Sequence, residues 1–232
     1  MKRFPTIAVI VVASAVLVLL AGTAVALRLA GRGPFREQPP PAKVPADLSQ
    51  ARPGAQPARA HGGGAGRAVT LEVFEDFQCP PCGQLHPKLK KVEEEYGERL
   101  RVVFRHLPLT SLHKHAMEAA LAAEAAAQQG RFWAMRDLLF ERQDEWSAAE
   151  QARPLFVEYA RGLWLDVEQF ERDMDAPETK ARVEADAGRG YSARVSGTPT
   201  VFLEGRELPC DEWTPEGMRA AIDAALGGRA SR

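Results

Sequence analysis

Two cysteines separated by two residues are the part of this sequence best suited to chemistry. Cys79 and Cys82 enclose Pro80 and Pro81, and a stretch of helical character follows them to about Tyr96. Cys79 therefore stands just before a helix start, where unpaired amide hydrogens and the helix dipole stabilise a thiolate. Cys82 lies one turn inside the helix and faces Cys79. We expect Cys79 to be the nucleophile of a reversible thiol–disulfide exchange, and Cys82 to resolve the mixed disulfide.

The same cysteine spacing is also typical of half of a structural zinc site. Four ligands would be needed, and no second pair stands nearby. The remaining candidates have no regular spacing; they are Cys210, His86, His113 and His115. Three cysteines are also too few for a disulfide framework. The redox interpretation is therefore favoured, and it requires no metal and no organic cofactor.

The residues around the cysteine pair predict an α/β domain. Residues 69–74 alternate in polarity and form a strand before the pair, Gly97 ends the helix after it, and residues 101–106 form a second strand. A wholly helical region follows, from about 110 to 190. Two short strands and a closing helix are expected over 200–203, 206–208 and 214–226. The predicted order is β-α-β, a helical insert, then β-β-α.

In this order and in four sequence blocks, the chain resembles the DsbA-like thiol–disulfide oxidoreductases of the thioredoxin superfamily. The blocks are DFQCPPC at 76–82, FRHLPL at 104–109, QGRFW at 129–133 and GTPTVF at 197–202. The resemblance covers the part from Val69 to the C-terminus. It implies a thioredoxin fold with an all-helical insert between its two halves.

The resemblance also implies an active-site loop at Thr198 and Pro199. In this family the peptide bond before the proline is cis, and the loop lies against the cysteines. Such a loop can leave the preceding backbone free to pair with an extended substrate peptide. An ordinary proline at a strand start is the alternative. Pro80 and Pro81 restrict the backbone of the turn between the cysteines, which can shift the redox potential of the pair.

One departure from the thioredoxin pattern concerns acidic residues. Thioredoxin-type reductants carry a buried acid six residues before the first cysteine, where this chain has Val73. Glu75 and Asp76 are closer, and either is a possible proton acceptor for Cys82, but we expect both to be solvated turn carboxylates. The missing acid weakens the case for a reductant and favours an oxidase.

Several further side chains are expected to be structural. We expect His86 to be partly exposed on its helix, and His113 and His115 to lie at the surface. Phe132 and Trp133 are expected in the core of the insert. Cys210 is interpreted as a small buried apolar residue, with an exposed thiol as the alternative.

The head of the chain differs in composition from the rest. Residues 1–28 contain an apolar run long enough to cross a hydrocarbon core of roughly 30 Å, so they predict a membrane anchor or a cleaved signal peptide. Residues 29–67 are rich in Pro, Gly and Ala and predict a disordered linker. Residues 68–232 form the predicted domain. We expect it to lie on the extracytoplasmic side of the cell membrane on a single anchor, or in the periplasm if the segment is cleaved.

The overall charge points to no nucleic-acid partner, because 30 basic residues face 31 acidic ones. We expect protein thiols and disulfides as substrates and a disulfide donated to folding proteins. The resemblance implies a membrane redox partner or low-molecular-weight disulfides as the reoxidant. A disulfide reductase or isomerase remains an alternative, and so does a non-catalytic thioredoxin-like binding module.

Overall fold

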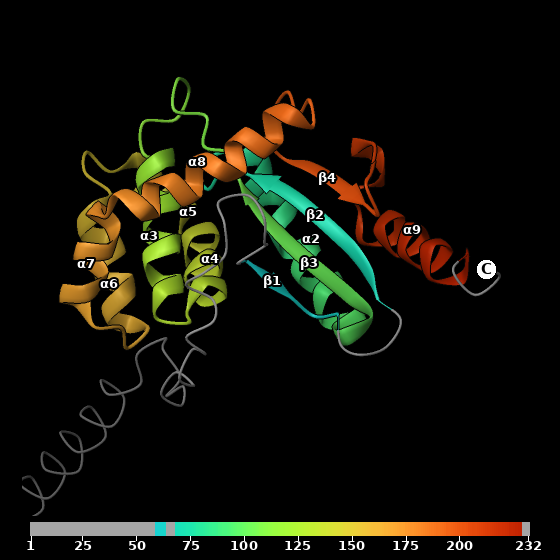
Figure 1. Ribbon diagram of the computed structural model, residues 1–232, viewed down its shortest axis with the longest axis horizontal. Helices are drawn as coiled ribbons and strands as arrows, with labels where there is room; N and C mark the ends of the chain where they lie inside the picture. Colours follow the sequence, from blue (N-terminus) through green and yellow to red (C-terminus); the bar gives the residue numbers. More distant parts are fainter. Residues whose placement is uncertain (1–58, 64–67, 229–232) are drawn as a thin grey trace, which may run out of the picture. The chain divides into compact units, whose positions relative to one another are not determined.

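The computed structural model describes residues 59–63 and 68–228 (Figure 1). The predicted anchor at 1–28 and most of the predicted linker lie outside these residues. Within the described part, no helix combines the length and apolar character needed to cross a membrane.

A mixed five-stranded sheet positions the active site. Its order is β1-β3-β2-β4-β5, and β2 runs parallel to β3 and antiparallel to β4. The strand bounds are β1 Ala60–His61, β2 Val69–Glu75, β3 Leu100–His106, β4 Thr200–Leu203 and β5 Arg206–Glu207. Phe74 near the end of β2 stands opposite Thr200 at the start of β4. This register brings the segment before β4 to the end of β2, where the cysteines follow.

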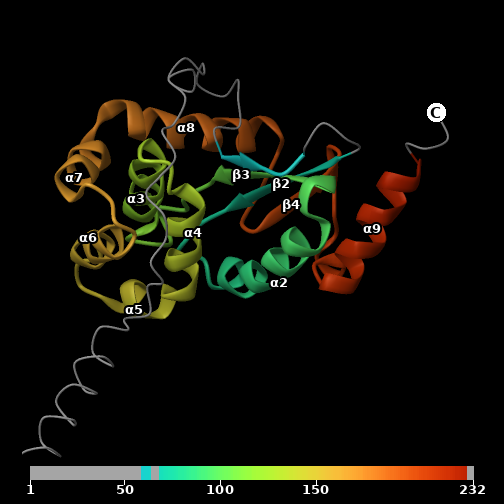
Figure 2. The same cartoon turned by 90° about the horizontal axis from the view of Figure 1, so that it is seen from below.

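Helices cover both faces of the sheet, and the insert adds a bundle beside it. The helices are α2 Pro80–Tyr96, α3 Ala116–Gln128, α4 Phe132–Glu141, α5 Gln143–Ala148, α6 Arg153–Gly162, α7 Val167–Asp175, α8 Pro177–Ser192 and α9 Pro215–Gly228, with short 3₁₀ turns at Gly97–Arg99 and Cys210–Glu212. Figure 2 shows α2 and α9 on one face of the sheet and α8 on the other. Gly190 lets α8 approach closely, since a Cβ there would come within 3.2 Å of the Phe74 ring.

Local sequence signals explain several helix ends. The backbone amide of Gly97, at a φ of 50°, donates to Glu93 at the end of α2. Asp166 caps α7 by accepting a hydrogen bond from the amide of Gln169 at 2.9 Å. The structure thus confirms the predicted α/β thioredoxin fold with an all-helical insert.

Two apolar cores meet at the redox helix. One lies between the sheet and helices α2 and α9, and contains Val73 and Leu85. The other lies within the insert and includes both Cys79 and Cys82. Phe77 joins the sheet to the insert, because its ring stacks on Phe104 of β3 at a centroid distance of 5.2 Å and lies 4.9 Å from the ring of Phe140 in α4. The cysteines are therefore held at a boundary between two packed layers.

The structure departs from the sequence expectations at several boundaries. Ala60 and His61, assigned to the linker by composition, pair with β3 as a short antiparallel strand. A strand pairs through its backbone amides and carbonyls, so the side-chain composition of this Gly- and Pro-rich segment does not indicate that two of its residues join the sheet. The return strand β5 is shorter than expected, and α3 begins later because a turn precedes it. Helix α5 lies within the region that was expected to be helical.

Candidate active site

The two cysteines lie at the start of α2 as free thiols, and both are buried. Cys79 is the N-cap of the helix, and its carbonyl accepts hydrogen bonds from the amides of Cys82 at 3.0 Å and Gly83 at 3.2 Å. The Gln143 side chain, from α5 of the insert, donates to the same carbonyl at 2.9 Å. Pro80 and Pro81 are exposed in the first helical turn, where a missing amide hydrogen costs nothing.

The environments of the two sulfurs differ strongly. Hydrogen bonding with Cys82 lowers the pKa of Cys79 to about 6, burial acts in the opposite direction, and Thr198 adds a smaller lowering effect. The pKa of Cys82 is raised well above its ordinary value, first by burial and then by its interactions with Cys79 and Glu75. At neutral pH the pair therefore combines a thiolate at Cys79 with a protonated thiol at Cys82.

The loop before β4 lies against the nucleophile, as expected. The Thr198–Pro199 peptide bond is cis. The Cys79 Sγ atom lies 3.3 Å from the Thr198 carbonyl oxygen. The hydroxyl of Thr198 is buried and has no hydrogen-bond partner. This loop is thus part of the sulfur's immediate surroundings.

Asp76 is buried and organises the active-site loop. Its Oδ1 atom accepts from the amide of Gln78 at 2.7 Å. Its Oδ2 atom accepts from the amide of Leu109 at 2.9 Å and lies 2.7 Å from His113 Nδ1. The expectation of a solvated carboxylate is wrong here, because the side chain ties the turn before Cys79 to the loop after β3.

Glu75 is also buried, with 2% of its surface exposed, and its Oε1 atom has no hydrogen-bond partner. The strand continues through Glu75, which stands opposite His106 of β3, so its carboxylate lies inside the protein rather than in a turn. Burial raises its pKa to about 8, although the charge of Arg136 acts against that shift. The expectation of a solvated carboxylate is therefore wrong for Glu75 as well.

Glu75 lies close to the position at which thioredoxin-type reductants carry their buried acid and this chain has Val73. Alternate residues of a strand point to the same face, so Glu75 shares the face of Val73 and lies one step closer to the cysteines. Its charge is one of the causes that raise the pKa of Cys82. The site therefore has a buried acid, at a position that a search six residues before Cys79 does not find.

A second buried carboxylate lies in the insert and is fully paired. Glu124 of α3 accepts a hydrogen bond from Arg59 Nε at 2.8 Å and lies 2.8 Å from His106 Nε2. The Arg59 guanidinium also lies over the Phe132 ring, 5.2 Å from its centroid. Burial alone would raise the pKa of Glu124, but Arg59 and His106 lower it to about 2.

The other singled-out side chains occupy varied places. Phe132 is buried in the insert core as expected, and Trp133 packs at its edge. His115 is buried, contrary to expectation, with Nε2 3.0 Å from the carbonyl of Ala149. His86 is buried too, so the expectation of partial exposure is wrong. Cys210 is exposed, which contradicts the buried interpretation and fits the alternative of an exposed thiol. None of His113, His115 and Cys210 joins the cysteine pair in a described cluster of potential metal ligands.

Comparison with known proteins agrees with this geometry. Residues 58–224 match the family model described as Thioredoxin. A curated relative, the Na(+)/H(+) antiporter NhaA 3 of Salinispora tropica, is 42% identical over 158 residues, which cover 68% of this chain and 23% of the relative. The chain thus spans about a quarter of the length of the curated relatives it matches.

Solved structures give the same fold. A thioredoxin-like oxidoreductase from Silicibacter pomeroyi is 26% identical, with a TM-score of 0.62 over 78% of this chain and 98% of the other. The α-DsbA1 protein of Wolbachia pipientis is 16% identical, with a TM-score of 0.62 over 73% of this chain and 91% of the other. The chain therefore belongs to the thioredoxin family, and its fold is DsbA-like.

Proposed function

We propose that this protein is an extracytoplasmic thiol–disulfide oxidoreductase that donates the Cys79–Cys82 disulfide to folding proteins. The observation that carries the proposal is the contrast between the two sulfurs, one with its pKa lowered to about 6 and the other buried with its pKa raised. A stabilised thiolate favours the reduced form of the pair. The disulfide is then a stronger oxidant of other thiols.

The reaction proceeds by two exchanges. A substrate thiolate attacks Cys79 Sγ, the Cys79–Cys82 bond breaks, and Cys82 leaves as a thiolate that takes up a proton. A second substrate thiolate then attacks the substrate sulfur of the mixed disulfide and releases Cys79 as a thiolate. Two electrons pass from the substrate dithiol to the enzyme, and the substrate gains one disulfide.

Glu75 is the residue we assign to the proton transfer at Cys82. Its carboxyl group is buried with a free oxygen, and its pKa of about 8 keeps it protonated at neutral pH. A protonated acid beside a buried leaving thiolate can supply the proton that the thiolate needs. In the reverse direction, the carboxylate accepts that proton and activates Cys82.

The loop at Thr198 and Pro199 is the proposed binding site for the substrate backbone. It lies against Cys79, so an extended peptide held there would present its own sulfur to the nucleophile.

Residues 1–28 are proposed as an anchor or signal, and the linker residues that precede β1 as a tether; together they would place the domain outside the cytoplasm. A membrane redox partner is proposed to reoxidise the cysteines. Relatives named as antiporters support a thioredoxin-like domain working beside a membrane.

Oxidative refolding of a reduced, unfolded client protein tests the proposal. The full chain should restore client activity, and Cys79→Ala should abolish that effect because no mixed disulfide can form. Cys210→Ala is the matched control, since this thiol is exposed and outside the pair, and it should retain full activity. Unchanged activity in Cys79→Ala would leave the catalytic proposal without support and favour a binding module. Activity only in insulin reduction would favour a reductase.

A further inference from the structure

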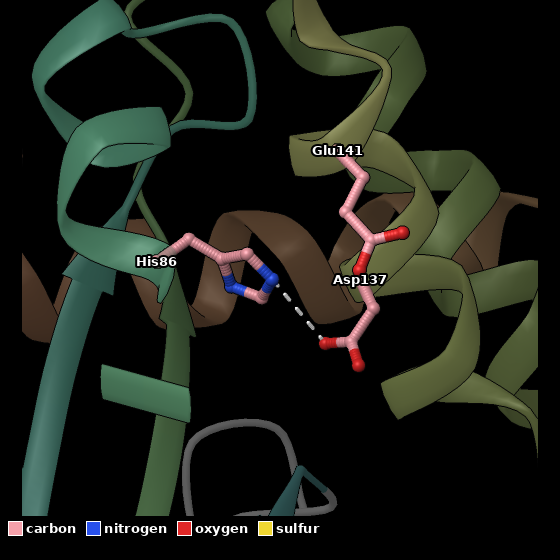
Figure 3. Close-up of side chains that lie close together, drawn as sticks. All are labelled: His86, Asp137 and Glu141. Carbon is pink, nitrogen blue, oxygen red and sulfur yellow. Dashed lines mark ion pairs between the residues drawn. The ribbon is translucent and has the colours of Figure 1, made fainter. Parts of the chain in front are cut away.

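The helix that carries Cys82 also carries a group of polar side chains that face α4. His86 and Lys90 are one turn apart on α2, and Asp137 and Glu141 are one turn apart on α4. Residues four apart lie on the same helix face, so each helix presents a pair to the other. Figure 3 shows His86 pointing across the gap toward Asp137, with Glu141 next to it.

His86 is the unusual member of this group. It is 4% exposed, and its Nε2 atom is buried with no hydrogen-bond partner. Asp137 Oδ1 lies 3.5 Å from Nε2, beyond the range of a well-formed hydrogen bond. Burial lowers the pKa of His86 to about 4, so the imidazole is neutral at pH 7. A buried nitrogen without a partner is costly, and this one is aimed at two carboxylates.

The three side chains have the composition of a metal site. His86, Asp137 and Glu141 each offer one ligand atom, and these atoms lie within 4.8 Å of one another. One imidazole nitrogen with two carboxylate oxygens suits Zn²⁺ and similar divalent ions, and leaves one position for water. Glu141 is exposed, so its side chain is free to rotate and close the remaining distance. We propose that His86, Asp137 and Glu141 bind a divalent transition-metal ion such as Zn²⁺.

Lys90 is the competitor for this position. Its Nζ atom lies 2.8 Å from Asp137 Oδ2 and 3.3 Å from Glu141 Oε1, so the ammonium group neutralises both carboxylates in this structure. The side chain is 37% exposed and can turn into solvent. A divalent ion attracts the carboxylates more strongly than one ammonium group does. It also accepts the lone pair of His86, whose Nε2 has no hydrogen-bond partner with Lys90 in place.

Two features of the surroundings bear on metal entry. Asp137 Oδ1 also accepts from Arg136 Nε and Nη2 at 3.2 Å, but that guanidinium is held by both oxygens of Glu93 at 2.9 Å, so Oδ2 becomes available to the ion once Lys90 turns away. Lys90 and Asp137 line an open pocket at the protein surface, which gives an ion a path from solvent. A bound ion would link α2 to α4, one turn beyond Cys82.

Zinc titration of the full chain in detergent micelles tests the site. The protein carries Cys210→Ser and an oxidised Cys79–Cys82 pair, so that no thiol can bind the ion. Competition with a chromophoric chelator should show one Zn²⁺ per chain, and loss of a ligand in Glu141→Gln or His86→Gln should weaken binding about tenfold or more. Lys90→Met should bind more tightly, because the competing cation is gone. The matched control is Glu158→Gln, another exposed glutamate on a helix, which should bind as the parent does.

Three outcomes would overturn the site. They are no saturable binding at micromolar zinc, equal binding by the parent and Glu141→Gln, and weaker binding by Lys90→Met. Glu141→Gln decides the matter even if the buried His86→Gln variant fails to fold, since Glu141 is exposed. None of these residues belongs to the redox pair, so client refolding by Cys79 can succeed or fail independently of the zinc result.

Discussion

Two buried glutamates near His106 show how a charge partner changes the chemistry of the same side chain. Glu124 has Arg59 and His106 as partners, and its pKa is lowered to about 2. Glu75 stands opposite His106 in the sheet, has an oxygen without a partner, and its pKa is raised to about 8. Burial acts alike on both groups. The presence of a direct cation decides which one is fixed as an anion and which one can exchange a proton near neutral pH.

Of these two glutamates, Glu124 contributes to stability, and Glu75 is the one we assign to the proton transfer. A fully paired buried carboxylate ties the segment before β1 to the insert. An unpaired one beside Cys82 destabilises the fold at alkaline pH, but can transfer a proton. Functional sites commonly retain groups of this kind, which lower the stability of the fold but are needed for the chemistry.

Removing the cation from the paired region should have the largest effect. Arg59→Met leaves Glu124 buried without its guanidinium, which should lower the free energy of unfolding by about 4 kcal/mol at pH 7. Denaturant unfolding measures the change. The pKa of Cys79, followed by thiolate absorbance in the folded variant, should not move. A loss below about 1 kcal/mol would mean that the pair contributes no more than an exposed salt bridge.

Acid should weaken the same region. The pKa of Glu124 is about 2 in the fold, against an ordinary value of 4.5. The unfolded chain therefore takes up this proton first as pH falls. Its contribution is complete above pH 4.5 and should fall by about 3 kcal/mol by pH 2. Stability measured from pH 6 to 2 in wild type and Glu124→Gln tests this, and identical pH slopes in the two proteins would contradict it.

Glu75→Gln should act in the opposite direction. The folded protein holds a proton on Glu75 between pH 4.5 and about 8 that the unfolded chain has lost, so this group costs stability as pH rises through that window. With both cysteines reduced, the variant should gain about 4 kcal/mol over wild type at pH 8 and nothing at pH 4, because about 3.5 pH units separate the two pKa values of Glu75. Its exchange with a client should slow by about tenfold or more, because Gln cannot pass a proton to Cys82.

Stopped-flow kinetics of client oxidation, together with denaturant unfolding at both pH values, measure these two effects of Glu75→Gln. A variant that is more stable but equally fast would remove Glu75 from the mechanism. One that is equally stable at pH 8 would contradict its raised pKa.

Thr198→Val should have the smallest effect. The Thr198 side chain makes a small contribution to the lowered pKa of Cys79, although its hydroxyl forms no hydrogen bond in this structure, and the substitution removes that hydroxyl with little change of volume. The midpoint of Cys79 alkylation against pH, about 6 in wild type, should rise by less than about one unit. An unchanged midpoint would show that the hydroxyl does not reach the sulfur.

Much of this fold could be predicted from the sequence, because periodicity and turn residues mark the strands, the redox helix and the insert. The nucleophile and the loop at Thr198 and Pro199 follow from short motifs. The burial of Glu75 and Asp76 could not be predicted in this way, since it depends on how far β2 extends and on the loop after β3 that covers it.

Contacts between distant segments are the other part that the sequence does not reveal. Arg59 meets Glu124 across 65 residues, and neither has a neighbour in the chain that indicates the pairing. His86 meets Asp137 only because α2 and α4 pack together. A helix-face histidine in the sequence gives no sign that its nitrogen is buried without a partner.

The redox equilibrium of the Cys79–Cys82 pair against glutathione tests the central claim most directly. The full chain is equilibrated with defined ratios of reduced and oxidised glutathione, and the oxidised fraction is read after thiol alkylation. We predict that the reduction potential of the Cys79–Cys82 pair lies near or above that of the glutathione couple, because a stabilised Cys79 thiolate favours the reduced form and makes the disulfide a donor. A potential far below that couple would contradict the account and make the protein a reductant.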